Sequence, residues 1–519
     1  DAVAALIPEA PTTANFAEES TYYGNLLYSG VDWFNIFAQG ALHLGWTEDW
    51  LSYTVSYQLC GYRADLLRGA CRPAGRSFGM YNITEGRKPW DVAAKSAAEI
   101  GHGAQRIYYY SYGPAYIGGD SFSLNTAVYP GLKLANYAIG AVEDYLVGAT
   151  VPKAKIAILY SHATDIWTLD QTYSTFGKDR MGLYFLLRHL GHPVDVLSES
   201  EVAAGRLAGD NYTMLFCDGS HMDSEALAPL LAWLNAGGVL YLGPGSLTYD
   251  QFNSPLGVDS QVGITRQTYQ SVSNPGREMY ELPNLPNLKP VSFDNTTLES
   301  VCGYQKVTSM GGGSPQVLAR FTDDNSSAVF TKTVGSGRLV FCGFFPGLAY
   351  QKGGMVSKLA RDAANPDFPT YGSTSWPAAY RTLFAQLVGA VPVPVTTGHY
   401  LVEANRLETA DGSPAPASVI ALANWTGDVA AGLEIRLPRS GRRGWPTSVL
   451  NPITSWHTED DTLVFTMDLA TPLDFVVVPA LEPPVPQIAG WQVGSSHGGG
   501  AGDVWSAVSD GYVEPRTAG

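Results

Sequence analysis

Two adjacent carboxylates flanked by tryptophans are the side chains of this sequence best suited to chemistry. The segment ALHLGWTEDW (41–50) reads as an apolar strand that ends in Glu48 and Asp49, with Trp46 and Trp50 beside them. Hydrolysis of a glycosidic bond needs two carboxyl groups, one to protonate the leaving oxygen and one to attack or stabilise the anomeric carbon. Aromatic rings offer flat apolar faces to a sugar. The segment therefore predicts Glu48 and Asp49 as catalytic residues and Trp46 and Trp50 as substrate-binding residues.

The same two acids have an ordinary structural explanation. Thr47 can cap a helix that begins at this point, and the helix dipole favours carboxylates in the first turn. Catalysis and capping are compatible, so both interpretations stay open for Glu48 and Asp49.

Three more residues near strand ends are candidates for the same site. Glu85 follows the strand RSFGMYNI (76–83) by two residues and is a third catalytic candidate, with a solvated turn residue as the alternative. Tyr110 and Tyr112 belong to the strand QRIYYYSYG (105–113) and are candidates for substrate binding, with packing as their default role.

These candidates lie in a region where strands alternate with helices. The strands near 41–50, 76–83 and 105–113 are separated by helical patterns, and a long amphipathic helix follows over 129–148. This spacing is close to the roughly 30 residues per unit of a (β/α)8 barrel. Residues 1–150 have room for three or four units, so we predict a partial barrel whose exposed parallel edge needs a partner.

The next region predicts a doubly wound α/β domain. Residues 153–248 alternate apolar strands, buried on both faces, with amphipathic helices, which is typical of a parallel sheet. No G-x-G-x-x-G follows the first strand, no Gly-x-Cys-x-Gly elbow occurs, and no Cys/His metal spacing is present, so we predict neither cofactor nor metal. We assign residues 151–395 to this domain, 396–482 to a small antiparallel β-sandwich of five short strands, and 483–519 to a Pro/Gly-rich tail.

Composition excludes some classes of partner. The 519 residues are 45% hydrophobic and 15% charged, with a net charge of −16. Nucleic-acid binding needs a basic face, so this charge argues against it. The sequence contains no run of about 20 apolar residues, so it predicts no membrane-spanning helix.

Cysteines and sequons favour a secreted glycoprotein. Cys60 and Cys71 flank a predicted helix-to-strand connection and are candidates for a local disulfide. The chain starts at Asp1, so we expect a processed product of a larger precursor. N-x-S/T sequons predict glycosylation at Asn82, Asn211, Asn295, Asn325 and Asn424.

The domain order resembles that of glycoside hydrolase family 42 β-galactosidases. In that family a catalytic barrel precedes a class I glutamine-amidotransferase-like trimerisation domain and a C-terminal β-domain. The resemblance implies a retaining β-galactosidase-like exo-glycosidase that acts on carbohydrate, and it identifies residues 1–150 as the end of the barrel. The segments that carry it are IAILYSHATDIW (156–167), YFLLRHLGHPVDVL (184–197), LAPLLAWLNAGGVLYLGPG (227–245), GSGRLVFCGFFPGLAY (335–350) and VIALANWTG (419–427).

One departure from the family keeps a second function open. The family's acid/base follows an Asn-Glu pair on strand four and its nucleophile ends strand seven, whereas this sequence has no Asn-Glu dipeptide and no Glu at the end of 76–83. The alternative is a catalytically inactive structural or carbohydrate-binding glycoprotein of an extracellular assembly. In either case we expect an associated N-terminal fragment or second chain to complete the barrel, and a homo-oligomer stays open.

Overall fold

All of the residues that the structure describes lie within Asp1–Leu481. The structure is a computed structural model. The chain divides into two units, Asp1–Leu481 and Glu482–Gly519. It describes residues 10–16, 31–49, 56, 58–84, 88–110, 126–168, 175–273, 282–354, 375–410, 412–413, 415–439 and 444–480. Among these residues, no helix is long and apolar enough to cross a membrane.

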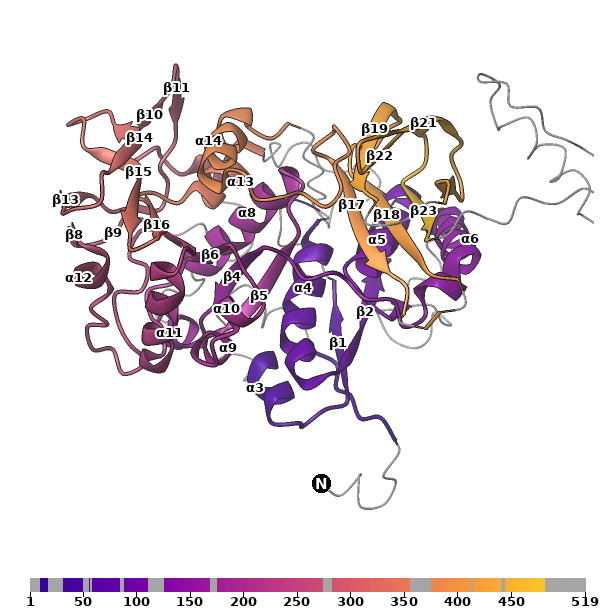
Figure 1. Ribbon diagram of the computed structural model, residues 1–519, viewed down its shortest axis with the longest axis horizontal. Helices are drawn as coiled ribbons and strands as arrows, with labels where there is room; N and C mark the ends of the chain where they lie inside the picture. The colour runs from indigo at the N-terminus through magenta and orange to yellow at the C-terminus, as the bar shows by residue number, and fades with distance from the viewer. Residues whose placement is uncertain are drawn as a thin grey trace, which may run out of the picture. The chain divides into compact units, whose positions relative to one another are not determined.

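A small parallel sheet forms the N-terminal part (Figure 1). Its three strands pair in the order β1-β2-β3, and residues up to Phe16 run alongside β1, because Phe16 bridges Thr47 in the parallel sense and His43 N donates to Thr12 O (2.9 Å). The sheet does not close within the described residues. Its elements are α3 (Trp33–Ala38), β1 (Leu44–Glu48), α4 (Leu59–Cys71), β2 (Ser77–Ile83), α5 (Pro89–Gly101), β3 (Arg106–Tyr110) and α6 (Tyr129–Leu146).

Helix α4 joins this sheet to the next one. It is buried almost all round, because it packs against β1 and β2 on one side and against β5 on the other. Gly69 makes the second contact possible, since a Cβ there would lie 2.5 Å from Val196 O.

A nine-stranded sheet forms the centre, in the order β11-β10-β14-β15-β16-β7-β6-β4-β5. The five strands from β16 to β5 are parallel, and β4, β5 and β6 are buried on both faces, as the apolar runs predict. Their order is that of a flavodoxin-like doubly wound sheet. The strands are β4 (Ile156–Tyr160), β5 (Val194–Ser198), β6 (Met214–Cys217), β7 (Val239–Leu242), β10 (Val291–Phe293), β11 (Thr296–Leu298), β14 (Gln316–Phe321), β15 (Ser327–Val334) and β16 (Gly337–Cys342).

Alternate residues of the central strands fill two separate cores. Ile156 and Ile158 of β4 face the cluster that contains side chains of α8, α13 and α14, whereas Ala157 and Leu159 face the cluster beneath α9 and α11. The helices are α7 (His162–Trp167), α8 (Thr175–His189), α9 (Glu199–Ala203), α10 (Arg206–Gly209), α11 (Ser224–Asn235), α13 (Pro346–Gly354) and α14 (Ala378–Val388).

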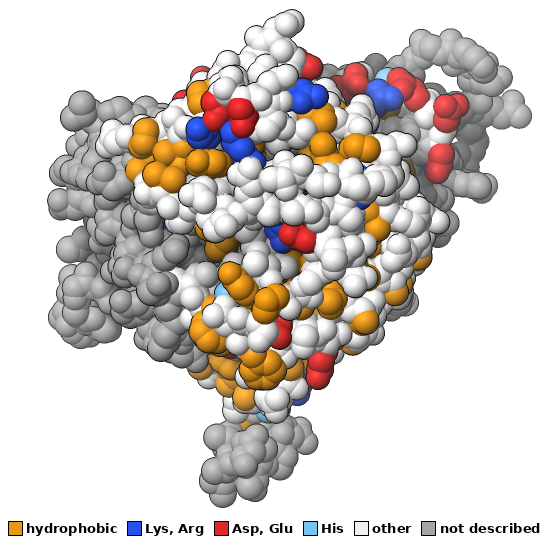
Figure 2. Space-filling model, turned by 90° about the vertical axis from the view of Figure 1, so that its left-hand side faces the viewer, with side chains coloured by type: hydrophobic (Ala, Val, Ile, Leu, Met, Phe, Trp, Pro, Cys, Tyr) orange, Lys and Arg blue, Asp and Glu red, His pale blue; other side chains and the backbone are white. Residues whose placement is uncertain are grey.

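A lobe of short elements extends the far edge of this sheet. It consists of α12 (Val258–Val262), β8 (Ile264–Arg266), β9 (Gln270–Ser271), β12 (Gly303–Tyr304) and β13 (Val307–Met310). Seen from this side, the surface has sparse charged side chains (Figure 2). Several are paired, as where Lys306 contacts Asp323 (3.0 Å) and Asp324 (2.7 Å). This face therefore offers no continuous cationic surface.

Two antiparallel sheets form the C-terminal part. Their facing side chains, among them Ile420, Ile435 and Phe465, share one core, and the outer face of the first sheet packs on α5 and α6. The first sheet has the order β17-β18-β23-β20 and the second β19-β22-β21. The strands are β17 (Val402–Glu408), β18 (Ala417–Asn424), β19 (Ala430–Pro438), β20 (Thr447–Ser448), β21 (Ile453–Glu459), β22 (Thr462–Leu469) and β23 (Leu473–Pro479).

A buried polar cluster joins the three parts. His102, just after α5, lies 2.7 Å from Asp65 Oδ1 on α4 and 2.6 Å from Glu403 Oε1 on β17, and Arg188 of α8 contacts the same Glu403 oxygen at 2.9 Å. Burial alone lowers the pKa of His102, but the two carboxylates outweigh it and raise that pKa above its usual value. The cluster thus holds a buried histidine between two acids.

The predicted disulfide is wrong. Cys60 and Cys71 are both buried free thiols on α4. Eleven residues of helix separate their Cα atoms by about 16 Å, whereas a disulfide requires Cα atoms within about 7 Å.

The helix-cap interpretation of the acids is also wrong. Thr47 lies inside β1 and its hydroxyl donates to Phe16 O (3.1 Å), and the next described helix, α4, begins only at Leu59. The acids at 48 and 49 therefore end a strand rather than start a helix.

Two of the five sequons do not fit a glycan in this fold. Asn82 and Asn424 are fully buried. The Nδ2 atom of Asn82 donates to Val92 O and Ser96 Oγ, and that of Asn424 to Asp428 O. The exposed sequons, which stay predictions, are Asn211, Asn295 and Asn325.

Candidate functional site

A row of aromatic side chains lines one face of the N-terminal sheet. Trp46 of β1 meets Tyr81 of β2 edge to face, with ring centroids 4.9 Å apart. Tyr81 in turn meets Tyr108 (5.3 Å) and Tyr110 (5.9 Å) of β3 in the same manner. Side chains two residues apart on a strand share a face, so these four rings lie on one surface. We call this surface the aromatic face.

A glycine lets the tryptophan lie down on the neighbouring strand. Trp46 is the register partner of Gly79 in the parallel pairing of β1 and β2. A Cβ at Gly79 would lie only 2.1 Å from the Trp46 ring, so any larger residue would lift the ring off the sheet. The sequence FGM at this point therefore sets the position of the indole.

Glu48 shares the aromatic face. It lies two residues after Trp46 on β1, pairs in register with Tyr81, and is half-buried. Asn15 of the neighbouring segment donates from Nδ2 to Glu48 Oε1 (2.7 Å), which orients the carboxylate. Burial raises the pKa of Tyr81, and the nearby Tyr108 hydroxyl and Glu48 carboxylate raise it further. The face thus combines flat apolar rings with one oriented carboxylate.

Asp49 points the other way and is structural. It is fully buried, its Oδ1 accepts from Ile83 N (2.6 Å), and its Oδ2 lies 2.6 Å from Lys95 Nζ. Burial, together with the Asp49 carboxylate, raises the pKa of Glu99 on α5 well above its usual range. Asp49 ties the end of β1 to β2 and α5, and the expectation that it faces substrate beside Glu48 does not hold in this geometry.

The remaining predicted residues are not all covered by the structure. Glu85, Trp50 and Tyr112 lie outside the described residues. Of the predicted set, the structure therefore brings together Trp46, Glu48 and Tyr110.

Tyr81 and Tyr108 complete the aromatic face but are not among the residues predicted from the sequence. Alternation in RSFGMYNI was the signal for Tyr81, and Tyr108 lies two residues before the predicted Tyr110 and so shares its face.

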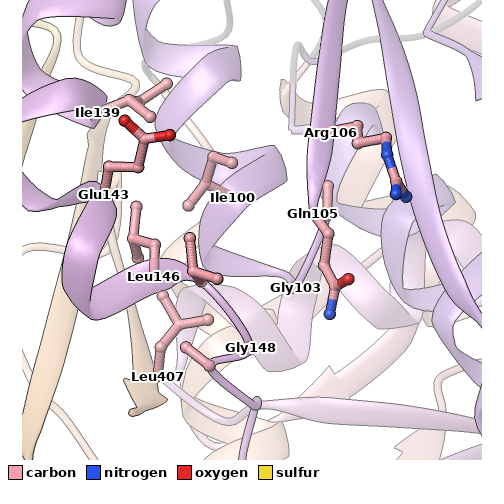
Figure 3. Close-up of a pocket in the computed structure, with 12 residues that line it drawn as sticks. Ile100, Gly103, Gln105, Arg106, Ile139, Glu143, Leu146, Gly148 and Leu407 are labelled. Carbon is pink, nitrogen blue, oxygen red and sulfur yellow. The ribbon is translucent and has the colours of Figure 1, made fainter. Parts of the chain in front are cut away.

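A cavity near this sheet lies at the opposite end of its strands. It has a volume of about 310 Å³ and is lined by Ile100, Gln105, Arg106, Glu143 and Leu407, among others. These residues surround the amino end of β3, whereas Glu48 and Tyr110 stand at the carboxyl ends of their strands. The Arg106 and Glu143 side chains lie on opposite sides of the cavity and do not converge (Figure 3). We assign no chemistry to it.

Comparison with solved structures shows the fold. No protein-family model and no curated protein sequence matches the chain. A catalytic mutant of Gan42B, a GH42 β-galactosidase from G. stearothermophilus, is similar with a TM-score of 0.59 and 15% identity, over 92% of this chain and 65% of that one. The β-galactosidase from Bacillus circulans sp. alkalophilus gives 0.61 and 12%, over 92% and 64%. Alpha-L-fucosidase isoenzyme 2 from Paenibacillus thiaminolyticus gives 0.58 and 14%, over 92% and 69%.

These matches confirm the predicted resemblance in fold to part of a family 42 β-galactosidase. The chain spans only about 65% of the length of the first of these structures. At 12–16% identity the likeness among the β-galactosidases is one of fold.

Proposed function

We propose that this chain is the C-terminal part of a glycoside hydrolase-like protein, with the aromatic face as one wall of a carbohydrate site. The observation that carries the proposal is the grouping of Trp46, Tyr81, Tyr110 and Glu48 at the carboxyl ends of parallel strands. In (β/α)8 enzymes the active site is built at this end. The Trp46 ring that lies on Gly79 suits a pyranose, and the carboxylate suits its hydroxyls or its anomeric carbon.

The reaction that fits best is the hydrolysis of a terminal β-galactoside with retention of configuration. Glu48 is the candidate carboxylate from β1. A retaining enzyme needs a second carboxyl group about 5–5.5 Å away. Asp49 is excluded from that role because its carboxylate is buried on the opposite face. Glu85 follows the adjacent strand β2 in the sequence and is the candidate for the second group.

The neighbouring enzymes supply the proposed substrate class. The similar structures are β-galactosidases and an α-L-fucosidase. All of these act on glycosides, so a sugar is the ligand to test first.

A second candidate function is carbohydrate binding without hydrolysis. It is favoured by the position of Asp49, which leaves Glu48 as the one carboxylate that the described strands β1–β3 present on the aromatic face. A single oriented carboxylate beside a row of aromatic rings can hydrogen-bond sugar hydroxyls without any bond cleavage.

A partner that completes the barrel belongs to the same proposal. Within the described residues β3 pairs only with β2, so the backbone groups on its other side pair with no described strand. Parallel strands with unpaired backbone groups call for a neighbour. We propose that further strands, from an associated fragment or a second chain, supply it. Secretion and N-glycosylation at Asn211, Asn295 and Asn325 stay part of the proposal, and a mass shift on enzymatic deglycosylation tests them.

The test is hydrolysis of chromogenic β-galactosides by the protein purified from its natural source and by recombinant variants. We expect turnover, lost in Glu48→Gln and retained in the matched control Glu434→Gln, because Glu434 is exposed on β19. No turnover over a glycoside panel, together with galactoside binding, would leave the binding function. Neither turnover nor binding would overturn the proposal.

A further inference from the structure

Three side chains converge at the carboxyl edge of the central sheet, apart from the aromatic face. They are His162, Glu199 and Asp223, and one ligand atom from each lies within 4.8 Å of the others. His162 follows β4, Glu199 follows β5 directly, and Asp223 follows β6 after a short loop. Because β5, β4 and β6 are adjacent and parallel, the ends of these strands meet at one edge. In doubly wound sheets this crevice is where ligands bind.

The Glu199 carboxylate is buried with one oxygen left over. Its side chain is fully buried, and its Oε1 accepts from Ser161 Oγ (2.7 Å) and from Asp223 N (3.2 Å). Its Oε2 is buried, faces His162 Nδ1 at 3.0 Å, and receives no aligned hydrogen bond. A buried carboxylate oxygen whose nearest partner, His162 Nδ1, is poorly aligned for a hydrogen bond is costly. A cation between Oε2 and Nδ1 would remove that cost.

The Asp223 carboxylate is also positioned to bind a cation. It occupies the residue before α11, where an acid ordinarily caps the helix, but its side chain makes no capping hydrogen bond. The usual structural explanation for an acid at this position therefore does not apply to it.

His162 provides the opening to solvent. Its side chain is 37% exposed, in contrast to Glu199. An ion can therefore enter from the His162 side, and a water molecule can complete its coordination there.

We propose that His162, Glu199 and Asp223 form a binding site for one divalent transition-metal ion, with Zn²⁺ as the best fit. Zn²⁺ takes imidazole nitrogen and carboxylate oxygen at about 2.0–2.2 Å, so its tetrahedral ligands stand about 3.4 Å apart. To reach that spacing, His162 Nδ1 and Glu199 Oε2, now 3.0 Å apart, would separate slightly, and the Asp223 oxygen, within 4.8 Å of the other ligand atoms, would adjust its position. The nitrogen ligand separates the site from the all-oxygen sites of Ca²⁺ and Mg²⁺.

The surroundings fit such a site. Ser161 holds the Glu199 oxygen that would not bind the metal, as the contacts that orient metal ligands commonly do. The ion would cross-link the loops after three neighbouring strands. Its role would therefore be to stabilise this edge of the sheet, independently of any sugar chemistry.

The experiment is calorimetric titration of the chelator-treated full chain with Zn²⁺. We expect one Zn²⁺ per chain from this site and an affinity at least about tenfold weaker in His162→Ala and in Asp223→Asn. The matched control is His457→Ala, because His457 also pairs with a glutamate, Glu459 at 2.9 Å, but is exposed and, among the described residues, belongs to no group of three ligands. The control is expected to bind as the unchanged chain does.

A second readout separates binding from misfolding. Zn²⁺ raises the Tm of a protein whose folded state alone binds it, so Tm should rise for the unchanged chain and for His457→Ala but not for Asp223→Asn. Asp223 is partly exposed, and circular dichroism of Asp223→Asn without metal should match that of the unchanged chain. Absence of Zn²⁺ binding by the unchanged chain, or equal affinity in all three variants, would overturn the proposal.

Discussion

Removal of Lys95 should loosen the end of β2 that borders the aromatic face. Lys95 Nζ lies 2.6 Å from Asp49 Oδ2, both side chains have no exposed surface, and Nζ also donates to Ile83 O (2.8 Å). In Lys95→Met the Asp49 carboxylate keeps its bond from Ile83 N but loses its counter-charge. The perturbation thus tests whether Asp49 is held away from the site by this pair.

The expected size follows from the burial of both partners. Removal of one partner of a buried ion pair costs about 3–5 kcal/mol. A loss of about 3 kcal/mol in local stability corresponds to a rise of roughly a hundredfold in the opening equilibrium. Part of the cost should be recovered in the double variant Asp49→Asn, Lys95→Met, because no charge is then left buried.

Hydrogen exchange measured by mass spectrometry is the suitable assay, since it reports opening of individual segments. Peptides from β2 and α5 should exchange about a hundredfold faster in Lys95→Met, and peptides from β22 should be unchanged. The matched control is Lys133→Met on α6, where the lysine is exposed. An effect below about 1 kcal/mol, or one equal to the control, would refute the reasoning.

Three further predictions concern other parts of the molecule. His102→Gln should destabilise the chain most below pH 6.5. The pKa of His102 is raised in the folded chain, so this histidine contributes stability below its unfolded-state pKa, and that stability is lost as the pH rises through its folded-state pKa. Urea titrations between pH 5 and 9 check this. Gly79→Ala should weaken galactoside binding, measured by titration, while it changes Tm little, measured by a thermal melt, because the new methyl group displaces the Trp46 ring. Addition of a thiol reductant should leave Tm unchanged, because the cysteines are buried free thiols; a drop in Tm would reveal a disulfide.

The roles of Glu48 and Asp49 show where sequence reasoning failed. Adjacent residues on a strand point to opposite faces, so two neighbouring carboxylates at the end of β1 cannot both face one sugar. Applied strictly, that rule would have separated them from the sequence. It does not say which of the two is the buried one, because this depends on Lys95, whose position on α5 follows only from the packing of the helix on the sheet.

The periodic parts of the fold were easier to predict. The runs at β4, β5 and β6 consist of residues buried on both faces, and such runs predict a central parallel sheet wherever they occur. The cluster of His162, Glu199 and Asp223 could not be predicted in this way. Its members are 24 to 61 residues apart in the sequence, and only the order of β5, β4 and β6 in the sheet brings them together.

The central claim is that the aromatic face binds a sugar, and the binding of a β-galactoside to a tryptophan variant tests it most directly. Trp46→Ala removes the ring that lies on Gly79, and Trp456→Ala removes an exposed ring of β21 outside the site. Titration calorimetry should show unchanged affinity for Trp456→Ala and an affinity weaker by at least about tenfold, or about 1.4 kcal/mol, for Trp46→Ala. Equal affinity in both variants would contradict the claim.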